Sequence, residues 1–384
     1  MTDPNEIEEY SPRRAEVVDD DGVWVHAVFP DDVPETGEAI RLGAPGESPP
    51  VANVREHLGG RRVRALMPRP HPEVAAGRPV ERTERAAVVP APEDRRLDLS
   101  QVDAAVEGEV EGDAFPFAWT RPSFGELTGL VGPRPLDHRG IALIAPPAGG
   151  GLNLFIDRTP SDRSWSWFAA ELADREEADA AVWLDPPESI DPDDQDWVLE
   201  PGRFERSTPV GLRIATCLVS HLRDAGRNVY LAAELPALRR TASSEEETAT
   251  GTSFGELVER LGTALASTQD GRCTVALRLP LADSDSRLEG IVETLDLGDV
   301  DAQIAVDSEG RFRPRRSISD VDPPPDREDE RRRAMSALRT ARRAEEKRDL
   351  FGDRELTDDQ VDALERTEAL RGRLGPGDEC DRTP

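Results

Sequence analysis

Apolar and polar residues alternate along the first part of the chain with the two-residue period of β-strands. The alternation predicts strands at residues 23–29, 38–42, 51–58 and 62–68. Gly59-Gly60, between the last two, is typical of a hairpin turn. Short strands joined by glycine turns predict a small β-barrel over residues 1–88, closed by Gly77-Arg-Pro-Val80 and preceded by mobile first residues.

Beyond residue 120, short apolar runs alternate with helical patterns. The expected strands are residues 141–145, 178–184, 229–233, 273–279 and 302–306, and the clearest helices are 165–172 and 210–223. Alternating strands and helices predict an α/β fold with a parallel sheet over residues 121–322. Residues 89–120, which contain prolines and an acidic stretch, are interpreted as a linker and a poorly ordered loop without a strand.

Residues 323–384 form a third segment, which begins with three prolines. Arginine and glutamate at helical spacing predict one helix at residues 326–352. Thr357-Asp-Asp-Gln360 is a capping pattern that begins a second helix. The expected C-terminal domain is a helical hairpin followed by an acidic tail.

Composition restricts the partners and the compartment. The net charge is −30 over 384 residues, so nucleic acid and anionic membranes would be repelled. Lys347 is the only lysine. Dense carboxylates with so little lysine favour a halophilic protein of a high-salt cytoplasm over an ordinary acidic protein. The three cysteines have no metal-ligand spacing and indicate a reduced, cytoplasmic location. His57 and His71 are expected to be solvated histidines.

The most distinctive motif follows the apolar run 141–145. A loop of small residues comes next, and Leu152, Leu154 and Phe155 are expected to begin a helix. Strand, glycine loop and helix is the arrangement of a phosphate-binding loop, in which backbone N–H groups surround the phosphates. The expected phosphate-contacting residues are Ala145, Pro146, Pro147, Ala148, Gly149, Gly150, Gly151 and Leu152.

This loop lacks the side chains that such loops use for chemistry. Gly151 stands where the lysine is expected, and Leu152 stands where the Mg²⁺-binding hydroxyl is expected. The sequence therefore predicts a degenerate phosphate loop.

Three segments of the first domain resemble the amino-terminal barrel of the β subunit of F-type rotary ATP synthases. They are Phe29-Pro-Asp-Asp-Val-Pro34, Val54-Arg-Glu-His-Leu-Gly-Gly-Arg-Arg-Val-Arg-Ala-Leu-Met67 and Ala76-Gly-Arg-Pro-Val80. Residues 213–231 resemble the helix and strand of the second nucleotide motif of rotary and flagellar-type ATPases, and the Ala-Pro-Pro of the loop is similar to the termination helicase Rho. The resemblance implies a RecA-like core between a β-barrel and a helical end.

The resemblance also implies roles for individual residues. Glu234 matches the acidic residue that holds Mg²⁺ through water, with one extra methylene. Asp185 and Glu188 lie on the loop that carries the water-polarising glutamate in the family, although a solvated loop carboxylate is the competing interpretation. Phe312 lies near the aromatic residue that stacks on adenine, or is a partly exposed phenylalanine beside a basic turn. The cofactor implied is ATP or ADP with Mg²⁺.

Three functions follow from these observations. The first is a non-catalytic pseudo-ATPase that assembles with itself or with related ATPase subunits, peripheral to a membrane complex, because three groups needed for phosphoryl transfer are missing or displaced. The second is an active subunit of a rotary, export or Rho-like ATPase with an atypical loop. The third is a stand-alone structural or regulatory protein.

Overall fold

A computed structural model describes residues 15–44, 48–117, 134–135, 148–158, 163–200, 208–234 and 271–280. It also describes residues 261, 265–268, 302–306, 312–316, 340–341, 343–344, 347–348, 356–357, 360–362 and 364–365. The chain divides into two compact units, residues 1–120 with 199–221 and residues 121–198 with 222–384. The predicted strand 141–145 lies outside the described residues.

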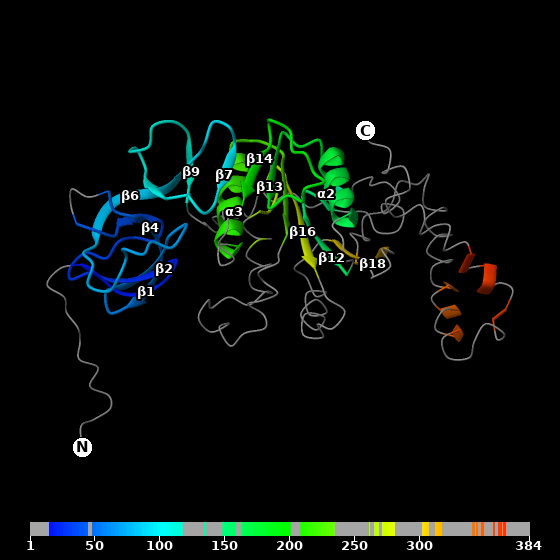
Figure 1. Ribbon diagram of the computed structural model, residues 1–384, viewed down its shortest axis with the longest axis horizontal. Helices are drawn as coiled ribbons and strands as arrows, with labels where there is room; N and C mark the ends of the chain where they lie inside the picture. Colours follow the sequence, from blue (N-terminus) through cyan, green and yellow to red (C-terminus); the bar gives the residue numbers. More distant parts are fainter. Residues whose placement is uncertain are drawn as a thin grey trace, which may run out of the picture. The chain divides into compact units, whose positions relative to one another are not determined.

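An antiparallel sheet of short strands forms most of the first unit (Figure 1). Its order is β1-β2-β5-β4-β3-β6-β8, and β9 also pairs with β6. The strands are β1 (Glu16–Asp21), β2 (Trp24–Val28), β3 (Glu38–Arg41), β4 (Val51–Gly59), β5 (Arg62–Leu66), β6 (Glu81–Pro90), β8 (Ala105–Val106) and β9 (Ala114–Pro116). The predicted hairpin is confirmed, and both of its turn glycines have positive φ, 81° at Gly59 and 57° at Gly60.

The sheet closes on itself as the sequence predicts. The segment before β6 pairs with β1, since Val17 N donates to Arg78 O (2.9 Å) and Val80 N donates to Ala15 O (3.0 Å). Apolar side chains from alternate positions fill the interior, among them Val25, Ala27, Ile40, Val54, Val63 and Met67. The first domain is therefore a small, side-chain-filled barrel.

The expected linker at 89–120 is wrong over its described part. β8 and β9 pair with β6, and β7 (Arg96–Asp98) is followed by Leu99, whose N–H donates to Glu200 O (2.9 Å) at the end of β14 (Trp197–Glu200). These strands are only two or three residues long, too short for an alternation pattern to show in the sequence.

His71 is also not the solvated histidine that was expected. Its side chain is buried, and its Nε2 lies 2.8 Å from Asp103 Oδ1. Arg69 donates to both oxygens of the same carboxylate, from Nε (2.9 Å) and from Nη2 (2.8 Å). Burial alone would raise the pKa of the Asp103 carboxyl, but the hydrogen bonds and charges of His71 and Arg69 outweigh it and lower this pKa to about 2.

This pKa makes a prediction for Asp103→Asn. A carboxyl with a depressed pKa stabilises the folded protein above its ordinary pKa of 3.8, and the contribution is lost as pH falls through about 2. Because the side chain is 46% exposed, solvent screening reduces the effect to about 1 kcal/mol. Urea denaturation at neutral pH should show a lower free energy of unfolding for Asp103→Asn than for wild type. The difference between the two proteins should become smaller toward pH 2.

The matched control is Asp113→Asn, at an exposed position of the same unit, which should change stability by less than about 0.5 kcal/mol. A gap between wild type and Asp103→Asn that stays constant with pH would contradict the assigned role of the Asp103 carboxylate.

A mainly parallel sheet forms the second unit, as predicted. Its order is β18-β17-β12-β16-β15-β13-β14. The parallel strands are β12 (Leu152–Asp157), β13 (Ala180–Leu184), β15 (Val229–Glu234), β16 (Cys273–Pro280) and β17 (Ala302–Val306). β18 (Phe312–Arg316) pairs antiparallel with β17, so Phe312 begins a strand where a basic turn was one of the two expectations.

Helix α2 (Arg163–Glu176) covers one face of this sheet (Figure 1). Phe155 of β12 stacks on Phe168 of α2, with ring centroids 4.8 Å apart, and Trp165 lies 5.7 Å from Phe155. The same cluster contains Tyr230, whose hydroxyl donates to Ala169 O (2.9 Å). Aromatic packing thus fixes α2 on the strands that carry the candidate site.

Helix α3 (Thr208–Asp224) confirms the helix expected at 210–223. Of the helix expected at 326–352, the structure describes residues 340–341, 343–344 and 347–348, which are helical. At the C-terminal end, Gln360 N donates to Thr357 Oγ1 (3.4 Å) and Thr357 N donates to Gln360 Oε1 (3.1 Å), which is the predicted reciprocal cap.

Candidate functional site at the carboxyl edge of the parallel sheet

The order of the strands shows where a ligand site belongs in this fold. The next long parallel strand in the chain after β12 is β13, which lies three strands away from β12 in the sheet. On the other side of β12, its direct neighbour is β17. In open α/β sheets, ligands bind outside the carboxyl ends of the strands at such a change of direction. The candidate site is therefore the edge where β12, β16 and β15 end.

Three charged side chains meet at this edge on one face of the sheet. Arg278 of β16 lies opposite Phe155 of β12 in the parallel register and opposite Glu234 of β15. Asp157 is two residues beyond Phe155, so it points to the same face. That face is the one covered by α2, because it carries Phe155, Tyr230 and Ala276 of the aromatic cluster.

These three residues form a buried ion triad, here named the Arg278 triad. Arg278 donates to Asp157 Oδ2 from Nε (3.0 Å), and its Nη2 lies 2.9 Å from the same oxygen. Arg278 Nη1 donates to Glu234 Oε2 (2.6 Å). The side chains are 4% exposed for Arg278, 0% for Asp157 and 22% for Glu234. One guanidinium therefore bridges carboxylates from both neighbouring strands.

Glu234 ends its strand as the sequence predicts, but its carboxylate does not fit the expected magnesium role. Mg²⁺ requires oxygen ligands close around it, and its charge would be repelled by a guanidinium 2.6 Å from one of those oxygens. Among the residues that the structure describes, no group of three His, Cys, Asp or Glu side chains is arranged to hold a metal ion. The residues at this edge thus do not fit Mg²⁺ while Arg278 is in place.

The helix predicted to begin at Leu152, after the expected phosphate loop, is wrong. Residues 152–157 are β12, not a helix, and Leu152 is a buried residue at the amino end of that strand. Ala148–Gly149 forms β11, paired antiparallel with β10 (Arg134–Pro135). Gly151 and Leu152 therefore lie at the edge of the sheet opposite to Asp157. Ala145, Pro146 and Pro147 lie outside the described residues.

The backbone of this segment also has hydrogen-bond partners within the protein. Ala148 N donates to Asn153 Oδ1 (2.7 Å), and Gly150 N donates to Thr274 Oγ1 (2.6 Å). The fully buried Asn153 side chain donates in turn to Ala148 O (2.9 Å) and to Val275 O (3.1 Å). The N–H groups of Ala148 and Gly150 are therefore bonded within the protein, and residues 148–151 form a corner that leads into β12.

The connection that occupies the phosphate-loop position in this fold is instead the one from β12 to α2. Its sequence, Arg158-Thr-Pro-Ser-Asp162, contains neither glycine nor lysine. A glycine-rich loop lets backbone N–H groups approach phosphates closely, and lysine neutralises their charge. Of this connection the structure describes Arg158, whose N–H donates to Val306 O (3.0 Å).

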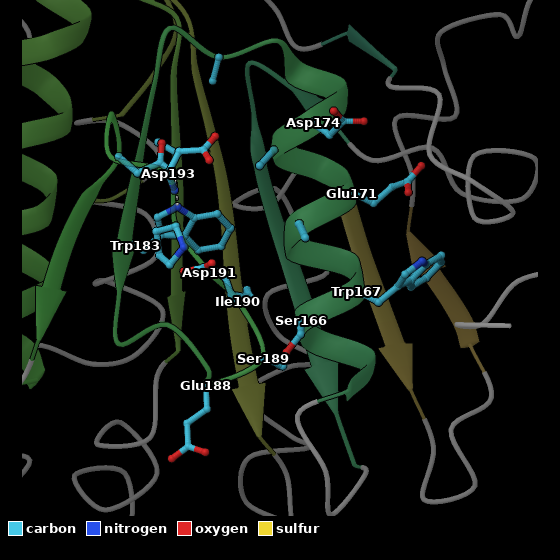
Figure 2. Close-up of a pocket in the computed structure, with 16 residues that line it drawn as sticks. Ser166, Trp167, Glu171, Asp174, Trp183, Glu188, Ser189, Ile190, Asp191 and Asp193 are labelled. Carbon is cyan, nitrogen blue, oxygen red and sulfur yellow. Dashed lines mark hydrogen bonds between the residues drawn. The ribbon is translucent and has the colours of Figure 1, made fainter. Parts of the chain in front are cut away.

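Asp185 and Glu188 lie on the loop after β13, as predicted, and both are exposed. Asp185 has a left-handed backbone, with φ of 55°. Glu188 lines a groove of about 1030 Å³ between α2 and residues 188–196. In Figure 2 its side chain extends away from Ser166 and Ser189, whose hydroxyl oxygens are 2.7 Å apart.

This groove is strongly acidic. Its carboxylates are Glu171, Asp174, Glu188, Asp191, Asp193 and Asp196, and none of its lining residues is Lys, Arg or His. Trp183 forms part of the lining (Figure 2), and its Nε1 donates to Asp196 Oδ2 (3.1 Å). Such a charge repels phosphates, so the groove is not a nucleotide pocket.

The fold of this chain, a barrel-like antiparallel sheet with a mainly parallel sheet, is similar to the fold of two solved structures. Two structures of the ATPase EscN, from the type III secretion system of enteropathogenic E. coli, are similar to this chain. The assembled EscN has a TM-score of 0.66 at 12% sequence identity, and EscN in complex with its central stalk EscO has 0.63 at 14%. In both comparisons the match covers 95% of each chain.

No protein-family model and no curated protein sequence matches the chain. The comparisons therefore show the fold. Within the described residues, no helix is long and apolar enough to cross a membrane.

Proposed function

We propose that this chain is a divergent, non-catalytic relative of the rotary and export-type ATPases, which acts as an assembly or regulatory subunit and does not turn over Mg-ATP. The observation that carries this proposal is the Arg278 triad. It places a protein cation between the two carboxylates at the edge where this fold would hold metal and phosphates.

The chemistry of phosphoryl transfer supports the same conclusion. Catalysis of this reaction depends on positioned cations, which stabilise the charge of the transferring phosphoryl group. Here the β12–α2 connection has no lysine in its sequence, and the carboxylate of Glu234 is bonded to Arg278. Glu188 is an exposed carboxylate beside five others, where a positioned water would face strong negative charge.

The partners proposed are copies of this chain or related ATPase subunits. EscN is described as an assembled ATPase, and in one structure it is bound to a central stalk. This chain has the same fold over 95% of its length, which supports a role in a comparable assembly. Its charge of −30 suits a cytoplasm rich in salt, where it would be peripheral to a larger complex.

The test of this function is multiple-turnover ATP hydrolysis by the purified full chain with Mg²⁺ in molar KCl. The proposal predicts that wild type releases phosphate no faster than the Glu234→Gln variant. Glutamine has the shape of glutamate but lacks its negative charge. Turnover in the wild type that Glu234→Gln abolishes would overturn the proposal, and would favour an active subunit with an atypical loop.

A further inference from the structure

We infer that Arg278 is a resident cation, which takes the place of a divalent metal ion between Asp157 and Glu234 and keeps this edge of the sheet closed to metal. The inference deepens the proposed function and rests on it, because it names the residue that makes the site independent of Mg²⁺.

The first argument is charge. Asp157 is fully buried and Glu234 is mostly buried, and two carboxylates close together in a protein interior require a cation or a proton. Both bond to one planar guanidinium, so they face a common space only a few ångströms across. A cation in that space satisfies both, whether it is supplied by Arg278 or by solution.

The second argument is geometry. Arg278 comes from the strand that lies between the two acidic strands, and the parallel register places it opposite Glu234. Its neighbours in β16 are buried apolar residues such as Leu277 and Leu279. An arginine in such a strand has a large desolvation cost, which the bonds to both carboxylates offset. The two carboxylates of Asp157 and Glu234 thus explain why an arginine can be buried at this position of β16.

The inference predicts that removal of the guanidinium creates a metal site. In Arg278→Ser the space left by the side chain can hold an ion and its waters, with carboxylate oxygens from β12 and β15 as ligands. Mn²⁺ is a suitable probe, since it accepts the same oxygen ligands as Mg²⁺ and is visible by electron paramagnetic resonance. We expect Arg278→Ser to bind one Mn²⁺ with a dissociation constant of about 0.1–1 mM, in the range of sites with few protein ligands.

Matched variants separate this site from general attraction of cations to an acidic protein. Wild type and Arg227→Ser, which loses an exposed arginine, measure the background. Arg278→Ser combined with Glu234→Gln lacks one of the two carboxylates and should return to that background.

A second measurement applies even if Arg278→Ser folds poorly. Mn²⁺ should raise its melting temperature, or restore its helical circular dichroism, and should do neither in the double variant. The inference is overturned if up to 10 mM Mn²⁺, roughly ten times the weakest expected dissociation constant, neither binds above background nor changes the folding of Arg278→Ser. Because no nucleotide is added, this result is independent of the ATP hydrolysis test.

Discussion

Arg278→Met is expected to lower the free energy of unfolding by about 3–5 kcal/mol, the usual cost when one partner of a buried ion pair is removed. Methionine fills much of the same volume, so the loss arises mainly from charge. Without the guanidinium, the fully buried carboxylate of Asp157 and that of Glu234 lose the positive charge that both of them contact. Urea denaturation followed by tryptophan fluorescence measures the loss.

Two further variants separate charge from packing. Arg227→Met removes an exposed arginine from the same unit and should change stability by less than about 0.5 kcal/mol. Replacing the whole triad, with Asp157→Leu and Glu234→Leu added to Arg278→Met, removes all three charges and should recover most of the loss. If Arg278→Met lowered the free energy of unfolding as little as Arg227→Met does, the Arg278 triad would not stabilise the packing of these strands.

The second large effect is expected at Asn153. Asn153→Leu keeps the size of the side chain but removes the acceptor for Ala148 N and the donors to Ala148 O and Val275 O. Each buried polar group left without a partner costs about 1–3 kcal/mol. With three such groups, a total loss of about 3 kcal/mol or more is therefore expected in the same denaturation experiment.

Thr274→Val is the matched control for this variant. It removes a single buried acceptor, the one for Gly150 N, and should cost about a third as much. Equal stability of Asn153→Leu and wild type would show that residues 148–153 do not need this internal network. The segment would then again be open to the role of a ligand-binding loop.

The sequence predicts the strands well where the alternation is long. The barrel hairpin, its closure by residues 77–80, helix α3 and strand β15 all lie where the pattern places them. The short strands β8 and β9 could not be predicted, because two or three residues carry no period.

The helix wrongly expected from Leu152 has a different cause. Small residues after an apolar run fit both a phosphate loop before a helix and a corner before a strand, and the loop residues alone do not separate the two. Residues 152–157, Leu-Asn-Leu-Phe-Ile-Asp, have buried side chains at every position, as central parallel strands do. The later Asp157 and Pro160 were the signal that the strand ends there and a loop begins.

The Arg278 triad could not be predicted from the sequence, although one of its signals is visible. An arginine within the apolar strand 273–279 predicts a buried acidic partner, because buried arginines are nearly always paired. Which carboxylates meet it depends on the register of β12 and β15 against β16, and these strands are separated by many residues along the chain. Only the assembled sheet shows that Asp157 and Glu234 are those partners.

The most direct test of the central claim is calorimetric titration of Mg-ATP into the wild-type full chain in molar KCl, with ATP in EDTA as the comparison. If the Arg278 triad closes this edge to metal and phosphates, no saturable heat should appear up to millimolar nucleotide, with or without Mg²⁺. Saturable binding that requires Mg²⁺ would contradict the claim, because it would show that the edge still accepts a metal-bound nucleotide while Arg278 is present.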